Sequence, residues 1–427
     1  MKFNTTKGSL AQQLDEKDPL ATFRDRFMVD DPDLIYLDGN SLGCLPKATQ
    51  EHMVEAIKHQ WGERLIRSWN ESWFRKPAEV GAKIAQIVGA EADEVIVCDT
   101  TSINLFKLAV AALHARPERK TILSDTLNFP SDLYILQGII HLLGENHRLD
   151  LVSSEDALSV PLVDVKDKIG KDTALVTLSH VSFKSAFMYD IKKITELAHQ
   201  AGALILWDLS HSAGAIPLHL HDWDVDLAVG CTYKYLNGGP GAPAFLYVRR
   251  DLQTQLSPPI WGWFGAQSPF DFDLDFRPAG DLTRFQISTP HILSLLAIEP
   301  ALEIILEAGM ENLRRKSIHQ SEYLIYLAQE ILLPQGYQLG SPTEVKRRGS
   351  HVTLQHPEAY RICRALIEPE EGNLRVIPDF REPDNIRLGI APLSTSFTDL
   401  YRAVARMETI IKEKSYRHYS RDPLTVT

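Results

Sequence analysis

The sequence predicts an α/β protein built on a mostly parallel sheet, and three observations support that class. Short continuous apolar runs such as residues 203–207 are typical of strands buried on both faces. Between residues 95 and 250 these runs alternate with helical patterns, an order that implies parallel pairing and right-handed crossovers. Polar residues follow several of the runs, as expected where a site lies at the carboxyl ends of parallel strands.

Each element is predicted from its own pattern. Strands are expected where apolar runs are bounded by turn residues, at residues 34–37, 95–98, 121–124, 174–178, 203–207, 225–231, 244–248, 351–354 and 374–378. Helices are expected where apolar residues recur every three or four positions, at residues 8–30, 47–90 with an interruption at 68–73, from 103 onward, 191–200, from 292 onward and 394–413. Asp271, Asp273 and Asp275 alternate with apolar residues, which predicts one more strand with a solvated face rather than a metal site.

Composition limits the class of protein and its partners. A chain of 427 residues is long enough for a large core and a second lobe. The formal charge of −11 argues against nucleic acid or anionic membranes as partners. The N-terminus lacks an apolar signal region, and no apolar run approaches the roughly 20 residues of a membrane span. The four cysteines form no disulfide or zinc pattern, so we expect a cytoplasmic protein without a bound metal.

Polar segments that follow the strands each admit a structural and a functional interpretation. D-G-N-S-L-G at residues 38–43, taken alone, favours a turn. Thr101 and Ser102 open a helix, where hydroxyl residues are common caps but where N–H groups and hydroxyls also bind phosphate. In the N-F-P-S-D segment, Phe129 offers a flat face for stacking, and Asp132 either forms a turn or contacts a ligand.

The strongest functional signal lies between residues 203 and 241. The first apolar run of this segment ends in a carboxylate, Asp208. The second ends in Thr232, Tyr233 and Lys234, and the N-G-G-P-G that follows forces the backbone into turns. Two adjacent strand ends would therefore present Asp208 and Lys234 to one cleft.

This pair has a specific chemical use. A partly desolvated lysine forms a Schiff base with an aldehyde cofactor, and an ionised aspartate holds a pyridine nitrogen protonated. Pyridoxal 5′-phosphate needs both groups, because its protonated ring withdraws electrons from the substrate. A lone lysine after a strand is most often solvated and a lone aspartate is often a cap. With His211 three residues after Asp208, the cofactor interpretation is favoured.

The motifs W-D-L-S-H-S-A-G and C-T-Y-K-Y-L-N-G-G-P-G resemble the cofactor region of fold-type I pyridoxal-phosphate enzymes of the aminotransferase class V group, and are similar to kynureninases in particular. D-G-N-S-L-G, F-P-S-D, G-W-F-G and R-x-x-x-x-P-L stand in that family's order, so the resemblance spans residues 38–393. It implies a fold-type I architecture. We expect an N-terminal segment at residues 1–50 that packs near the active site, a large cofactor-binding domain at 51–300 and a small α+β domain at 301–427.

The resemblance also implies roles for individual residues. Lys234 carries the cofactor and takes the α-proton, Asp208 sustains the electron sink, and Tyr233 assists proton transfer. The implied cofactor contacts are Thr101, Ser102, Phe129, Pro130, Ser131, Asp132, Ser179, Asp208, His211, Tyr233, Lys234, Trp263 and Thr289. The implied substrate contacts are Arg387, which holds the α-carboxylate through two parallel N–H donors, and Asn40 and Ser41. Trp263 and Thr289 serve the phosphate of the neighbouring subunit in the family, which implies a homodimer with shared active sites.

The activity implied by the resemblance is the hydrolysis of the Cβ–Cγ bond of L-kynurenine or 3-hydroxykynurenine, in tryptophan catabolism or NAD biosynthesis. The products are anthranilate or 3-hydroxyanthranilate, and L-alanine. Two alternatives are another class V lyase such as a cysteine desulfurase, and a non-catalytic binding protein with this fold. A desulfurase needs a mobile catalytic cysteine, and Cys363 has no loop of Gly, Ser and His around it. Trp69 and Trp73 are candidate walls of a pocket for the aromatic ring.

Overall fold

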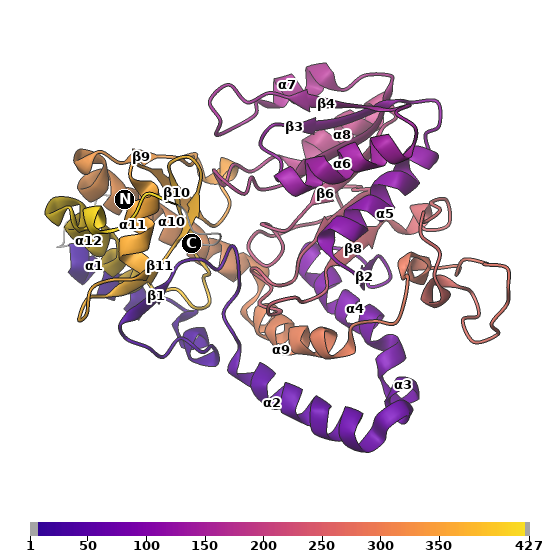
Figure 1. Ribbon diagram of the computed structural model, residues 1–427, viewed down its shortest axis with the longest axis horizontal. Coiled ribbons are helices and arrows are strands. Elements are labelled where there is room, and N and C mark those ends of the chain that lie inside the picture. The colour runs from indigo at the N-terminus through magenta and orange to yellow at the C-terminus, as the bar shows by residue number, and fades with distance from the viewer. Residues whose placement is uncertain (1–6, 423–427) are drawn as a thin grey trace.

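A seven-stranded sheet forms the centre of the larger part of the protein (Figure 1), in a computed structural model that describes residues 7–422. The order across this sheet is β2-β8-β7-β6-β5-β3-β4. Its strands are β2 (Val95–Val97), β3 (Thr121–Asp125), β4 (Arg148–Val152), β5 (Thr173–Ser179), β6 (Leu204–Asp208), β7 (Leu227–Gly230) and β8 (Phe245–Val248). The five neighbouring strands β7, β6, β5, β3 and β4 pair in parallel. The predicted α/β class with a mostly parallel sheet is therefore confirmed.

Two strands of this sheet differ from the prediction. β8 runs antiparallel to both of its neighbours, although the sequence predicts parallel pairing up to residue 250. A glycine-rich loop rather than a crossover helix joins β7 to β8, and such a direct connection permits antiparallel pairing. β4 is absent from the predicted strands because Arg148 and Asp150 interrupt its apolar pattern. It is an edge strand in which Val152 is buried and Arg148 is exposed.

Alternate residues of the strands pack on opposite faces of the sheet. In β6, Leu204 and Leu206 face one core cluster, whereas Ile205 and Trp207 face the other. The first cluster includes residues of α5 (Thr101–His114) and α6 (Pro130–Leu142). The second includes residues of α4 (Lys76–Val88), α7 (Leu162–Lys168), α8 (Ile191–Ala201) and α9 (Ile292–Ala308). Because helices cover both faces, the carboxyl ends of the parallel strands are the places left for polar groups.

A smaller lobe surrounds a four-stranded antiparallel sheet of order β12-β13-β10-β9. Its strands and helices are β9 (Gln338–Leu339), β10 (Val352–Gln355), β12 (Asp379–Arg381), β13 (Asn385–Leu388), α10 (Met310–Leu327), α11 (Ala359–Ile367) and α12 (Phe397–Glu413). The N-terminal α1 (Lys7–Glu16) lies beside α12, and β1 (Leu34–Tyr36) pairs in parallel with β11 (Arg375–Ile377) (Figure 1). The predicted domain boundaries at residues 50 and 300 stay a prediction, and residues 1–6 and 423–427 lie outside the described part.

Two segments project from the large sheet. α2 (Lys47–Glu55), a π-helical stretch (Ala56–Arg64) and α3 (Ser68–Glu71) form an arch that leads into α4, so the predicted interruption at residues 68–73 contains a short helix (Figure 1).

The predicted strand at Asp271, Asp273 and Asp275 is wrong, because these residues belong to a loop. No strand of residues 7–422 pairs with it, and the side chain of Leu274 is fully exposed. Within the same residues, no helix has the length and apolar character to cross a bilayer.

Candidate active site

Asp208 closes β6 and is fixed there by three hydrogen bonds. Its Oδ1 accepts from the Ser210 backbone N–H at 2.8 Å and from Ser210 Oγ at 2.6 Å. Its Oδ2 accepts from Ser179 Oγ at 3.4 Å, because Ser179 ends β5 in register with Asp208. The predicted strand ends therefore bring Ser179 and Asp208 together, with both side chains buried.

Lys234 follows β7, the strand that pairs with β6, and its Nζ lies 3.4 Å from His211 Nε2. The same Nζ is 5.9 Å from the ring centres of Phe129 and of Tyr233. Burial, together with the charge of Lys234, holds the pKa of His211 well below its usual value, so His211 is a neutral imidazole. Four predicted residues, Phe129, His211, Tyr233 and Lys234, thus lie together at the carboxyl ends of the strands, where Asp208 ends β6.

The D-G-N-S-L-G segment packs on the backbone of the lysine loop. The Gly43 N–H donates to the Tyr233 carbonyl at 2.8 Å. A Cβ atom on Gly43 would lie 2.3 Å from the Lys234 carbonyl oxygen, a distance that backbone atoms cannot relieve. Glycine at position 43 therefore allows the N-terminal segment to approach Lys234 closely.

The start of α6 brings Asp132 into the same group. Phe129 is the N-cap of this helix, Pro130 is its first residue, and Asp132 is buried in its first turn. Burial, followed by the nearby Asp208 carboxylate, raises the pKa of Asp132 well above its usual value. Asp132 is therefore placed to keep a proton while Asp208 accepts hydrogen bonds.

The start of α5 offers backbone N–H groups and hydroxyls of the kind that suit an anion. Thr100 caps this helix by accepting from the Ile103 N–H at 3.4 Å. The N–H groups of Thr101 and Ser102 belong to the first helical turn, where they have no intrahelical acceptor. Ser102 Oγ lies 3.4 Å from Ser131 Oγ on α6, so a predicted phosphate contact and a predicted cofactor contact come from adjacent helix starts.

Arg387 lies on β13 and is almost completely buried, with 1% of its surface exposed. Its Nη1 donates to the Phe183 carbonyl at 2.5 Å, and its Nη2 donates to Ser41 Oγ at 2.9 Å. Nη2 also forms an ion pair with Asp379. The structure therefore brings Arg387 and Ser41 together as predicted, but both Nη atoms that were expected to hold a carboxylate already have protein partners.

Several polar atoms around Arg387 are buried without a hydrogen-bond partner among the described residues. They include both amide atoms of Asn40, one carboxylate oxygen of Asp38 and Nε of Arg387. Burial, together with the Asp379 carboxylate, raises the pKa of Asp38 to about 6, against the opposing effects of Ser41 and Arg387. Since buried polar groups are nearly always paired, these atoms indicate a place for a polar ligand.

Three residues of this site are not predicted from the sequence. Asp379, Phe183 and His351 approach Arg387 and Phe129 only through folding, and none of them stands in a motif quoted from the sequence. A histidine or carboxylate at the end of an apolar run is the sequence signal that could indicate such residues. The same signal also occurs at many residues with a purely structural role.

Trp263 and Thr289 lie away from Lys234 and its neighbours, at exposed positions on the surface of the protein. Trp263 packs against Phe264 and Phe270, and Phe264 packs against Trp69. Trp69 and Trp73, the candidate walls of a ring pocket, therefore belong to an aromatic cluster with the Trp263 loop.

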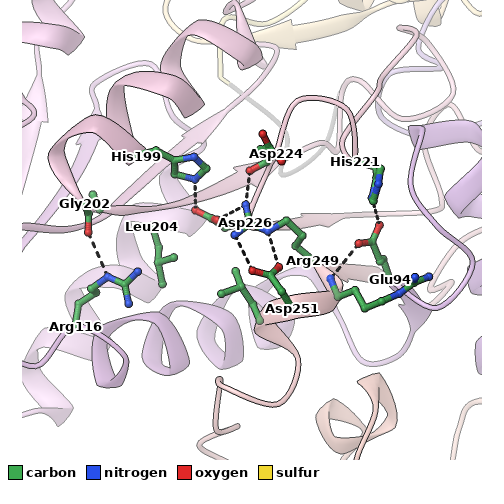
Figure 2. Close-up of a pocket in the computed structure, with 13 residues that line it drawn as sticks. Glu94, Arg116, His199, Gly202, Leu204, His221, Asp224, Asp226, Arg249 and Asp251 are labelled. Atoms are coloured by element: carbon green, nitrogen blue, oxygen red, sulfur yellow. Dashed lines mark hydrogen bonds and ion pairs between the residues drawn. The ribbon is translucent and has the colours of Figure 1, made fainter.

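A hollow of about 760 Å³ lies at the amino ends of β6 and β7 (Figure 2), whereas Lys234 follows the carboxyl end of β7. Its two buried carboxylates are paired within the protein. Asp226 contacts His199 Nε2 at 2.9 Å and Arg249 Nη1 at 3.1 Å, and Glu94 lies 3.3 Å from His221 Nδ1. These pairs hold neighbouring strands and loops together, and their geometry leaves no uncommitted group for catalysis.

Comparison with known proteins identifies the family. The chain is 41% identical over 408 residues to a kynureninase of Pseudomonas fluorescens, and the alignment covers 94% of this chain and 95% of that relative. The chain belongs to the kynureninase family. A kynureninase of Burkholderia mallei is 40% identical over 413 residues, which cover 95% of this chain and 96% of the relative. The family model for the kynureninase C-terminal domain matches residues 313–407, so the resemblance drawn from the motifs is confirmed.

Solved structures confirm the predicted fold type. The apo cysteine desulfurase of Thermococcus onnurineus superposes with a TM-score of 0.77 at 20% identity, covering 94% of this chain and 98% of that one. A C-DES mutant with glycine covalently linked to its PLP cofactor gives 0.76 at 17% identity, covering 90% and 98%. At such identities the likeness concerns the fold, and kynureninases and desulfurases share it.

The donor set of the kynureninase site fits pyridoxal 5′-phosphate, the predicted cofactor. A half-buried lysine beside a neutral histidine suits an aldehyde carbon, and the fixed Asp208 carboxylate suits a pyridine N–H. The first turn of α5 offers N–H groups and hydroxyls to a phosphate. The described residues contain no group of three or more His, Cys, Asp or Glu side chains that could hold a metal ion.

Proposed function

We propose that this protein is a pyridoxal-phosphate-dependent kynureninase that hydrolyses L-kynurenine, or its 3-hydroxy derivative, to anthranilate or 3-hydroxyanthranilate and L-alanine. The observation that carries this proposal is the full-length similarity to kynureninases, in a chain whose Asp208, His211 and Lys234 lie together. Its place in tryptophan catabolism or NAD biosynthesis and its cytoplasmic location follow from the sequence interpretation alone.

The residues divide the chemistry among them. When bound, pyridoxal phosphate supplies an electron-withdrawing ring conjugated to the substrate Cα. Lys234 Nζ takes the proton from Cα, and Asp208 accepts a hydrogen bond from the ring nitrogen. Burial keeps the pKa of Tyr233 above its usual value, so its hydroxyl holds a proton that it can donate. Water supplies the hydroxyl of the aromatic acid and a hydrogen for Cβ when the Cβ–Cγ bond breaks.

The remaining predicted residues hold the cofactor and the substrate. Phe129 offers its ring face to the pyridine, and Asp132, which keeps its proton, can donate to an oxygen of the ring. Thr101, Ser102 and Ser131 are assigned to the phosphate. Asn40, Ser41 and Arg387 are assigned to the substrate, because Asn40 and Arg387 keep buried atoms without a partner and Arg387 contacts Ser41.

The decisive assay compares L-kynurenine, 3-hydroxykynurenine and L-cysteine as substrates. The holoprotein should release anthranilate and alanine from L-kynurenine, and should release little or no sulfide from L-cysteine. Burial raises the pKa of each of Cys44, Cys98, Cys231 and Cys363, so none is poised as the thiolate that desulfuration requires. Stoichiometric alanine and sulfide from cysteine, with no aromatic acid from either kynurenine, would refute the proposal. No product from any of the three would favour the non-catalytic alternative.

We also assign the protein a homodimeric state with shared active sites. The aromatic cluster around Trp263 is exposed at Phe270 and Phe272, which are 53% and 74% exposed. Such a patch of large apolar side chains is typical of an interface. A second copy seated there would receive Trp263 and Thr289 near its own α5, where the phosphate is assigned.

Hybrid dimers test this assignment. Lys234→Ala and Trp263→Ala subunits should each be nearly inactive, and mixing them should restore up to about a quarter of the activity per site, because one hybrid site carries neither change. Activity is measured after subunit exchange has been demonstrated with tagged protomers. Complete subunit exchange without recovery of activity would contradict shared active sites. Full activity of the Trp263→Ala homodimer would show that Trp263 is not part of the site.

A further inference from the structure

His351 is a fully buried histidine of the small lobe whose two ring nitrogens have no hydrogen-bond partner among the described residues. The carbonyl groups of Phe183 and Lys184 lie near this ring and raise its pKa, against the larger opposing effect of burial. They accept from Arg387 Nη1 and from Thr353 Oγ1, each at 2.5 Å. A buried imidazole with both nitrogens unpaired is unusual in a folded protein and requires an explanation.

The register of the small sheet decides where His351 points. Thr353 of β10 pairs with Arg387 of β13, and the next pair is Val352 with Leu388. His351 stands two residues before Thr353, so both side chains lie on one face of the sheet, the face that also carries Arg387. Because Thr353 and Arg387 both reach the loop of the large sheet at residues 183–184, this face is turned toward the large lobe.

Across the gap, the ring of His351 lies 5.8 Å from the ring of His211. His211 in turn contacts Lys234 Nζ at 3.4 Å. His351 therefore lies near both the lysine assigned to the cofactor and the arginine assigned to the substrate. Burial, followed by the charges of Arg387 and Lys234, holds the pKa of His351 well below its usual value. The neutral ring has one N–H donor and one acceptor.

The substrate carboxylate needs such a donor. Arg387 has protein partners on both Nη atoms, and Nε is its one nitrogen without a partner. A carboxylate has two oxygens, each able to accept hydrogen bonds. We propose that His351 is a substrate-contact residue that donates its ring N–H to the α-carboxylate of the amino-acid substrate, beside Arg387. The proposal rests on the proposed function for the identity of the substrate, and its binding test stands apart from C–C cleavage.

The test measures binding of L-alanine and of L-alaninamide, which lacks the carboxylate, through the change in cofactor absorption of the holoprotein. His351→Leu should weaken L-alanine binding about ten- to a hundredfold, the range for a hydrogen bond to a charged group, and should leave L-alaninamide binding within about twofold. His351→Gln keeps an N–H donor and should recover L-alanine binding to within about threefold of wild type. With kynurenine, the KM of His351→Leu should rise more than kcat falls.

Thr353→Val is the matched comparison, because it removes a hydrogen bond between the lobes from the same face without removing an unpaired donor. It should leave the ratio of L-alanine to L-alaninamide affinity unchanged. The proposal is overturned if His351→Leu changes neither ligand or both equally, if Thr353→Val reproduces its effect, or if the wild type does not bind L-alanine. A wild type that binds L-alanine but forms no anthranilate refutes the proposed function alone.

Discussion

Lys234→Ala should leave a folded protein whose release of anthranilate from kynurenine falls at least about a thousandfold. Removal of the amine deletes both the group that joins the cofactor and the base that takes the substrate α-proton, and a positioned proton-transfer group alone contributes about 10²–10⁴. Lys234 is half-buried, and its Nζ lies 3.4 Å from His211 Nε2, at the place assigned to the cofactor. Anthranilate fluorescence at saturating kynurenine and added cofactor measures the loss.

Two observations separate this result from simple misfolding. Borohydride reduction of the wild-type holoprotein, followed by peptide mapping, should place the pyridoxyl group on Lys234. Lys193→Ala, on the exposed face of α8, is a matched control and should keep wild-type activity and labelling. A label on any other lysine, or a Lys234→Ala protein within tenfold of wild type, would contradict the central assignment.

The sequence predicts the centre of the site better than its periphery. Asp208 and Lys234 are predictable because two buried apolar runs end in charged residues, and parallel strands bring those ends together. Asp379 and His351 are not predictable in this way, since they reach Arg387 from separate strands of the small sheet and carry no local motif. Their role depends on tertiary packing, which the spacing of residues along the chain does not encode.

The same distinction explains the errors in the fold. Alternation of apolar and acidic residues at 271–275 imitates a strand, yet a strand also requires a neighbour, and this loop has none among the described residues. β8 has the composition of the parallel strands, and it runs antiparallel where the glycine-rich connection at residues 231–244 contains no crossover helix. Pattern therefore predicts the local element, whereas connections and neighbours determine pairing.

Arg387→Met should lower kcat/KM for kynurenine about a hundredfold and should also destabilise the protein. The guanidinium is 1% exposed and forms an ion pair with Asp379, which is 4% exposed. Removing one member of a buried pair leaves the other charge uncompensated, which costs about 3–5 kcal/mol. We expect the low end of that range, because Arg381 Nε remains 3.1 Å from Asp379. Urea unfolding at fixed protein and cofactor concentrations measures the change, since both concentrations shift the apparent stability.

The double variant Arg387→Met with Asp379→Leu separates stability from substrate binding. Replacing both members of a buried pair by apolar side chains of similar size is often nearly neutral, so most of the lost stability should return. Activity should not return, because the carboxylate still lacks its cation and the Ser41 hydroxyl still lacks its donor. The cofactor absorption spectrum should remain that of the wild type in Arg387→Met, in Asp379→Leu and in the double variant, since Arg387 contacts no residue assigned to the phosphate. Additive losses of stability would show that the two residues act independently, and recovery of kcat/KM in the double variant would mean that the carboxylate is held elsewhere.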